Sequence, residues 1–172
     1  MAARPRKTIR GKALRLACWN ADGVRGRKLE VEHFLSQIGV DICLLIEIFL
    51  NSGQAFRLAN YVCHRTDRPS AGGGTAILVR RGIIHPSVPV PNLTHLETTA
   101  IQVIIAGRAV KILAAYLSLS RPLIGADLSA CFRGGCRSYW HGTSTPNTWI
   151  GTRGFSRDGG NSYVITPTRT PV

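Results

Sequence analysis

The chain has 172 residues, of which 44% are hydrophobic, and a formal net charge of +13. This length is enough for one domain with a hydrophobic core, and no apolar run approaches the roughly 20 residues of a membrane-spanning helix. The segment before Lys12 is basic and lacks the apolar stretch of a secretory signal. The composition therefore argues against a membrane protein and predicts one that is not secreted.

The positive charge predicts a polyanionic partner. The chain has 22 lysines and arginines against 9 aspartates and glutamates, and many of the basic residues lie between Arg4 and Lys28. Nucleic acid is the leading candidate, and a generic basic tail is the alternative. Aromatic residues make up only 7% of the chain, which favours contact with the phosphate backbone over stacking on bases.

The first predicted elements are a strand, a helix and a second strand. Residues 14–23 are typical of a strand running into a turn, and the apolar run Ile42–Leu50 predicts a strand buried on both faces. Residues 28–38 predict a helix, because apolar side chains recur at i, i+3, i+4 and i+7 from Val31. Such a unit normally makes the two strands parallel, with both carboxyl ends at the ligand-binding edge of the sheet.

A lone carboxylate, Glu47, lies within the second apolar run. A charge buried there would cost several kcal/mol unless it binds a cation, pairs with a base or faces a cleft at a strand end. Asn20 and Asp22 have the same parity, so in extended chain they project to one side. The unit would bring these three side chains together as an oxygen-ligand site suited to Mg²⁺. The alternative is a surface-turn aspartate and an unrelated glutamate at a strand end.

Further strands and one more helix are predicted downstream. The strands cover residues 61–65, 75–79, about 96–105 and 110–117, and the helix covers residues 124–132. The run Gly72–Gly74 is followed by a strand and not by Lys-Ser/Thr, so it predicts a hairpin turn and not a phosphate-binding loop.

The pattern changes near Gly134. From Gly135 to Val172 no period of 2 or 3.6 is sustained, and the stretch is rich in Thr, Ser, Gly, Pro and Arg. Taken alone, it predicts a disordered basic tail. The predicted organisation is a basic N-terminal extension (1–12), a folded region (13–133) and this tail (134–172).

Four motifs together resemble the endonuclease domain of jockey-type non-LTR retrotransposons, a branch of the endonuclease/exonuclease/phosphatase superfamily that includes AP endonucleases. They are Cys18–Gly23, Glu47, Gly72–Val79 and Ala115–Ser118. The resemblance implies a two-sheet α/β sandwich, of which this chain holds the N-terminal half. It also implies Mg²⁺-dependent nicking of target DNA, which leaves a 3′-hydroxyl to prime reverse transcription, with no small-molecule cofactor. With the basic start, it predicts a nuclear or cytoplasmic protein.

The resemblance also implies roles for individual residues. Asn20 and Asp22 match the first active-site motif of the family, and Glu47 matches its principal metal-ligand glutamate. Tyr116 matches the tyrosine that contacts the scissile phosphate. We therefore predict Asp22 and Glu47 as metal ligands, and Asn20 and Tyr116 as catalytic residues. Without the resemblance, Tyr116 would be interpreted as a strand aromatic whose hydroxyl reaches a buried partner.

The chain departs from the family pattern in three places. The residues around Glu47 are apolar (Ile46, Ile48 and Phe49) where the family has polar ones, which would loosen support of the metal ligand. Leu119 replaces a proline. The Asp-x-Asn and Ser-Asp-His motifs, which carry the water-activating aspartate, a transition-state asparagine and the catalytic Asp–His pair, are absent.

A shifted reading frame accounts for the missing motifs. When the codons of Cys136 to Gly151 are read one base earlier, they permit Leu-Pro-Val-Leu-Leu-Ala-(Arg or Trp)-Asp-(Leu or Phe)-Asn-Ala-Lys-His-Val-Asp-Trp. This closely matches the Asp-x-Asn strand of the family. We therefore hypothesise a frameshift near Gly134, which makes the rest of the chain an out-of-frame peptide.

Three functions remain open. The first is a fragment of a Mg²⁺-dependent DNA endonuclease, inactive as written, which the motif series favours. The second is a non-catalytic basic nucleic-acid-binding protein, which the net charge of +13 favours. The third is a relative that acts on phosphoesters of lipids or small molecules, which explains neither the basic start nor the loop pattern.

Overall fold

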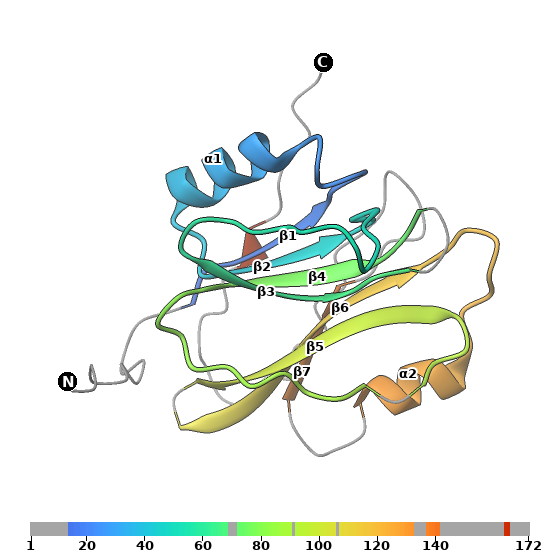
Figure 1. Cartoon of the computed structure of the whole chain (residues 1–172). Helices are drawn as coiled ribbons and strands as arrows, with labels where there is room; N and C mark the ends of the chain where they lie inside the picture. The colour runs from blue at the N-terminus through green and yellow to red at the C-terminus, as the bar shows by residue number, and fades with distance from the viewer. Residues whose placement is uncertain are drawn as a thin grey trace.

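The computed structural model describes residues 14–68, 72–90, 92–105, 107–132, 137–141 and 164–165. Within these ranges, two helices and eight strands form two sheets (Figure 1). The strand order is β3-β4-β2-β1-β8 in the first sheet and β5-β6-β7 in the second. The prediction of a mixed α/β protein with two sheets is confirmed.

The elements stack in four layers. Helix α1 (Lys28–Ile38) packs its buried Val31 and Leu35 against the outer face of the first sheet. The inner faces of the two sheets enclose a second apolar cluster, which includes Leu44 and Ile112. Helix α2 (Gly125–Phe132) packs against the outer face of the second sheet, and Figure 1 shows the two helices on opposite sides of the sheets. Within the described residues, neither helix is long and apolar enough to cross a membrane.

The predicted strand–helix–strand unit is confirmed. Strands β1 (Leu16–Asn20) and β2 (Ile42–Ile46) are parallel neighbours, and α1 connects them. The helix ends at Gly39, whose φ of 68° is a left-handed conformation that glycine adopts without steric cost. All five residues of β2 are buried, because one of its faces packs toward α1 and the other toward the second sheet. A continuous apolar run is therefore what this position requires.

Strands β3 (Tyr61–Thr66) and β4 (Thr75–Arg80) complete the first sheet in antiparallel pairing, with β4 between β3 and β2. In the second sheet, β5 (Leu96–Ile105) pairs antiparallel with β6 (Arg108–Leu117). The carboxylate of Asp127 in α2 accepts hydrogen bonds of 2.8–3.1 Å from three consecutive backbone N–H groups, those of residues 94–96. These bonds attach α2 to the start of β5.

Two short strands lie in the region predicted as a disordered tail. Strand β7 (Arg137–His141) pairs in parallel with β6, and β8 (Val164–Ile165) pairs in parallel with β1. The interpretation of residues 134–172 as a disordered tail stays a prediction. Neither segment has the alternation of a half-buried strand or the continuous apolar run of a buried one, so pattern analysis misses them. The other residues of the tail, like the predicted extension 1–12, lie outside the described residues.

Candidate active site

The parallel strands β1 and β2 end side by side, with Asn20 opposite Ile46. Beyond the strand ends, the two segments stay together. The N–H of Ala21 donates to the Ile46 carbonyl at 2.8 Å, and the N–H of Gly23 donates to the Glu47 carbonyl at 2.9 Å. The structure therefore places Asn20, Asp22 and Glu47 on adjoining segments at the carboxyl edge of the sheet, where α/β proteins bind ligands.

Glu47 lies immediately after the end of β2, in a left-handed conformation with φ of 53°. Such a conformation costs about 1–3 kcal/mol for a residue other than glycine, so neighbouring contacts must hold it. The N–H groups of Ile48 and Phe49 donate to the carbonyls of Gly74 and Gly73, at 3.4 and 3.0 Å. The turn takes Glu47 out of the apolar layer and leaves it half-buried, without an ion pair to any described residue. This explains how a carboxylate is tolerated in the apolar run.

Asp22 does not project as the extended-chain argument expects. The strand ends at Asn20, and Asp22 adopts φ of 42°, so the alternation of a strand no longer applies. The N–H of Asp22 donates to Oδ1 of Asn20 at 3.1 Å. Its carboxylate is 65% exposed and forms an ion pair with Arg27 at 3.5 Å. The two residues predicted as metal ligands therefore differ: Glu47 is half-buried, whereas Asp22 faces solvent and Arg27.

Tyr116 reaches the site from the other sheet. It lies near the end of β6, opposite Glu97 of β5. Burial raises the pKa of Tyr116, and the charges of Glu47 and Glu97 raise it further, while Arg68 partly offsets them. A phenol is protonated at neutral pH even at its ordinary pKa, so Tyr116 can donate a hydrogen bond. The structure thus brings Tyr116 of the second sheet beside Glu47 of the first.

Two further residues at this site were missed by sequence reasoning. Glu97 accepts a hydrogen bond from the N–H of Gly74 at 2.6 Å, and its other oxygen forms an ion pair with Arg68 at 3.1 Å. The available signal was a carboxylate in an otherwise neutral strand. This carboxylate indicates a site residue only when the pairing of β5 with β6 is known, because that pairing places Glu97 opposite Tyr116. Register of this kind cannot be read from a single strand.

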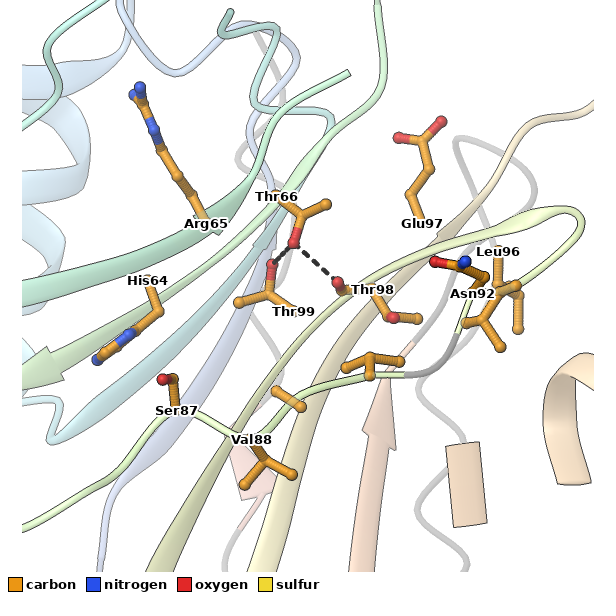
Figure 2. Close-up of a pocket in the computed structure, with 13 residues that line it drawn as sticks. His64, Arg65, Thr66, Ser87, Val88, Asn92, Leu96, Glu97, Thr98 and Thr99 are labelled. Atoms are coloured by element: carbon orange, nitrogen blue, oxygen red, sulfur yellow. Dashed lines mark hydrogen bonds between the residues drawn. The ribbon is translucent and has the colours of Figure 1, made fainter. Parts of the chain in front are cut away.

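A cavity of about 430 Å³ lies next to this site, between β3 and β5 (Figure 2). Its floor carries a hydrogen-bonded group of threonines. The hydroxyl of Thr66 donates to the carbonyl of Thr98 at 2.8 Å, and the hydroxyl of Thr99 donates to Thr66 at 3.0 Å. Figure 2 shows the Glu97 carboxylate at the rim, turned away from these threonines. Val88, Val90 and Leu96 also line the cavity, so its lining is mixed, and Glu97 belongs both to this lining and to the pair that lies opposite Tyr116.

The donor chemistry of the edge fits a hard cation. Among the described residues, no three His, Cys, Asp or Glu side chains lie close enough to form a metal site on their own. Mg²⁺ does not need such a cage, because it binds through one or two carboxylates and completes its shell with water and substrate phosphates. The carboxylate of Glu47 and the amide oxygen of Asn20 are oxygen donors on adjoining segments. They fit Mg²⁺ better than a metal that prefers nitrogen or sulfur.

A sequence profile of the Endonuclease/Exonuclease/phosphatase family matches residues 17–161. The chain belongs to this family. The matched region continues past Gly134, where the sequence pattern changes, so the frameshift near that residue stays a prediction.

Curated relatives narrow the class to retrotransposons. The chain is 36% identical over 81 residues to a probable RNA-directed DNA polymerase from transposon X-element of Drosophila melanogaster, a match covering 45% of this chain. It is 28% identical over 102 residues, 54% of this chain, to the RNA-directed DNA polymerase from mobile element jockey of the same species. The matches span only 9% and 11% of those two proteins. The predicted relationship to jockey-type non-LTR retrotransposons is confirmed.

Solved structures support the fold. The endonuclease domain of TRAS1, a telomere-specific non-LTR retrotransposon, superposes with a TM-score of 0.59 at 15% identity, covering 76% of this chain and 60% of that domain. The AP endonuclease LMAP from Leishmania major superposes with a TM-score of 0.50 at 14% identity, covering 70% of this chain and 44% of that one. The chain therefore has part of the AP-endonuclease fold.

Proposed function

We propose that this chain is a fragment of a Mg²⁺-dependent DNA endonuclease that nicks target DNA for retrotransposition, and that it is inactive as written. The observation that carries the proposal is the meeting of Glu47, at the end of β2, with Tyr116 of β6. One sheet supplies a carboxylate for a hard cation, and the other supplies a protonated phenol. This pairing suits the hydrolysis of a phosphodiester.

Each residue has a defined part in this scheme. The Glu47 carboxylate and the Asn20 amide oxygen would hold Mg²⁺, which when bound stabilises negative charge on a phosphate. The hydroxyl of Tyr116, which is protonated at neutral pH, would donate a hydrogen bond to a phosphate oxygen. We assign Asp22 to the outer part of the metal site, reached through water, since its carboxylate faces solvent and Arg27.

DNA is the proposed partner because the net charge of +13 favours a polyanion and the curated relatives are retrotransposon proteins. A non-catalytic nucleic-acid-binding protein is the second candidate, and the same charge favours it. The two differ in their need for metal. An endonuclease requires Mg²⁺ for turnover, whereas electrostatic binding requires none and weakens steeply with salt.

The proposed inactivity follows from the missing Asp-x-Asn and Ser-Asp-His motifs. The register of the second sheet supports the frameshift hypothesis. Ala114 of β6 pairs with His141 of β7. Tyr116 lies two residues after Ala114. In the shifted reading frame, the aspartate of the Asp-x-Asn motif lies two codons after that of His141, and the two strands run in parallel. In a chain with the frame repaired and the register kept, that aspartate would come beside Tyr116.

The test is nicking of supercoiled plasmid by the chain as written and by a frame-repaired chain, each with Mg²⁺ and with EDTA. We expect nicking only by the repaired chain and only with Mg²⁺. Metal-independent, salt-sensitive retention of the plasmid by both chains, with no nicking, would instead favour the DNA-binding protein. Mg²⁺-dependent nicking by the chain as written would overturn the proposed inactivity.

A further inference from the structure

Glu97 and Arg68 form an ion pair that the proposed function leaves unused. Oε1 of Glu97 lies 3.1 Å from Nε of Arg68, and the two side chains are 22% and 23% exposed. A partly buried pair of this kind holds both side chains in one geometry, unlike an exposed surface pair. Glu97 is opposite Tyr116 in the sheet, so the ion pair lies at the edge of the proposed active site.

Glu97 is connected to the backbone around Glu47. Its Oε2 accepts the N–H of Gly74, and the Gly74 carbonyl accepts the N–H of Ile48, the residue after Glu47. The pair also lies directly against Gly73, where a Cβ atom would come within 2.7 Å of Oε2 of Glu97. Only glycine leaves room for this approach, and its φ of 68° is left-handed as well. The loop Gly72–Gly74, which we call the glycine loop, therefore fits around the ion pair.

Arg68 is held by one end of its guanidinium. Its ion pair with Glu97 is made through Nε, and this is the one ion pair found for Arg68 among the described residues. Arg68 lies against Glu97, which is opposite Tyr116 in the pairing of β5 with β6. A guanidinium has a planar set of donors that matches the oxygens of a phosphate, so a fixed arginine here has the chemistry of a phosphate-binding group.

We propose that Arg68 binds a phosphate of the DNA backbone beside Glu47 and Tyr116, and that Glu97 is a positioning residue that fixes the guanidinium and the glycine loop. This rests on the proposed function, because DNA supplies the phosphate. It adds a fixed positive group to the site, next to Glu97 and Gly73. It also explains why the acidic side chain of Glu97 lies on the proposed DNA-binding surface.

The competing explanation is that Glu97 only stabilises the loop. The two explanations predict opposite signs when its charge is removed. If Glu97 acts on DNA only through its negative charge, Glu97→Gln removes a repulsion and tightens binding. If it positions Arg68, the same change releases the guanidinium and weakens binding, because the amide still accepts the Gly74 N–H but no longer pairs with Arg68.

The experiment measures binding of the whole chain to a fluorescein-labelled 12-base-pair DNA duplex, in EDTA and over a range of salt concentrations. We expect Arg68→Gln to weaken binding about 5- to 10-fold and to lower the salt slope by about one. Arg68→Lys keeps the positive charge but lacks the planar set of N–H donors of a guanidinium. We therefore expect it to bind DNA more tightly than Arg68→Gln and less tightly than the parent chain. The matched control is Arg108→Gln, at the exposed start of β6 and far along the strand from Tyr116, which should change affinity less than about 2-fold.

Glu97→Gln should weaken binding about 3- to 10-fold, with thermal unfolding followed to show that the variant folds. Tighter binding by Glu97→Gln, or equal losses for Arg68→Gln and Arg108→Gln, would overturn the proposal. If Glu97→Gln does not fold, the comparison of Arg68→Gln with Arg108→Gln decides, because both leave the Gly74 hydrogen bond intact. The measurement needs no cleavage, so it tests Arg68 in the chain as written, which we propose does not nick DNA. If the frame-repaired chain also fails to nick, the proposed function fails and the binding result for Arg68 still stands. A chain that does not bind the duplex fails both.

Discussion

At the end of the first sheet, Asn20 and Glu47 come together because two consecutive parallel strands end side by side. In the second sheet, Glu97 and Tyr116 come together only because β5 and β6 pair in one register. The first arrangement follows from local sequence, since a strand–helix–strand unit brings its carboxyl ends to one edge. The second depends on pairing between segments. Sequence motifs indicate Asn20, Glu47 and Tyr116. The site therefore has one half whose assembly follows from local sequence and one half that only the pairing of distant strands assembles.

The glycine loop joins these two halves, and breaking it should have the largest effect on stability. In Gly74→Ala, the new Cβ would lie 2.9 Å from Cγ1 of Ile48, at a φ of 81°. We expect a loss of about 3 kcal/mol in the free energy of unfolding, from steric strain and the left-handed conformation together. Urea unfolding of the purified chain measures this loss.

The matched control is Gly107→Ala. Its φ is 75°, but no described atom lies within 4 Å of the added Cβ, so it isolates the conformational cost at about 1 kcal/mol. Equal losses for the two variants would show that the contact between the loop and Ile48 contributes little.

The half contributed by the second sheet is tested by Tyr116→Phe in the frame-repaired chain. Removal of the hydroxyl deletes a donor to the phosphate, and we expect nicking to slow about 100-fold, equivalent to about 2.7 kcal/mol. Thermal unfolding should change little, because the aromatic ring remains. A variant that nicks at the normal rate would return Tyr116 to the role of a packing residue.

A structural carboxylate provides a contrast with those of the site. Burial acts to raise the pKa of Asp127, but hydrogen bonds from the N–H groups of Thr94, His95 and Leu96 outweigh it and lower the pKa. Because the folded pKa is lowered, its contribution to stability is present above the ordinary pKa of aspartate and is lost as the pH falls through the folded value. We expect Asp127→Asn to cost about 2 kcal/mol at neutral pH.

Urea unfolding at several pH values checks this expectation. The difference between Asp127→Asn and the parent chain should shrink below the ordinary pKa of aspartate. The exposed Glu30, which pairs with Arg27 at the surface, is a suitable control as Glu30→Gln and should change stability by less than about 0.5 kcal/mol. A difference for Asp127→Asn that does not depend on pH would contradict the charged interaction.

The smallest effect is expected far from the site, at Tyr61. Its hydroxyl donates to the Val40 carbonyl at 2.6 Å and connects β3 to the segment after α1. Tyr61→Phe should cost about 1 kcal/mol in unfolding free energy, with no effect on nicking by the repaired chain. If Tyr61→Phe lost as much nicking activity as Tyr116→Phe, the loss in Tyr116→Phe could not be assigned to a contact between Tyr116 and the phosphate.

Local pattern predicted much of the fold. The helix over residues 28–38 was predicted with the bounds it has, because its apolar face is regular and Gly39 ends it. The strand around Leu44 was recognisable because both of its faces are buried. The direction of the Asp22 carboxylate could not be predicted, because the chain leaves the strand conformation after Asn20.

The pair of Glu97 with Arg68 could not be predicted either. These residues are far apart in sequence, and nothing local to either indicates the other. Strand β7 was not predicted for a similar reason. It is defined by its pairing with β6 and not by a pattern in its own sequence. What remained hidden in the sequence is what depends on contacts between distant segments.

The most direct test of the central claim is plasmid nicking in Mg²⁺ by the frame-repaired chain and by its Glu47→Gln variant. This substitution keeps the shape of the side chain and removes the charge that would hold the metal. The account predicts a loss of at least about 100-fold, while Glu30→Gln on the surface of α1 nicks normally. Equal nicking by the repaired chain and its Glu47→Gln variant would contradict the assignment of the active site to the edge where β1 and β2 end.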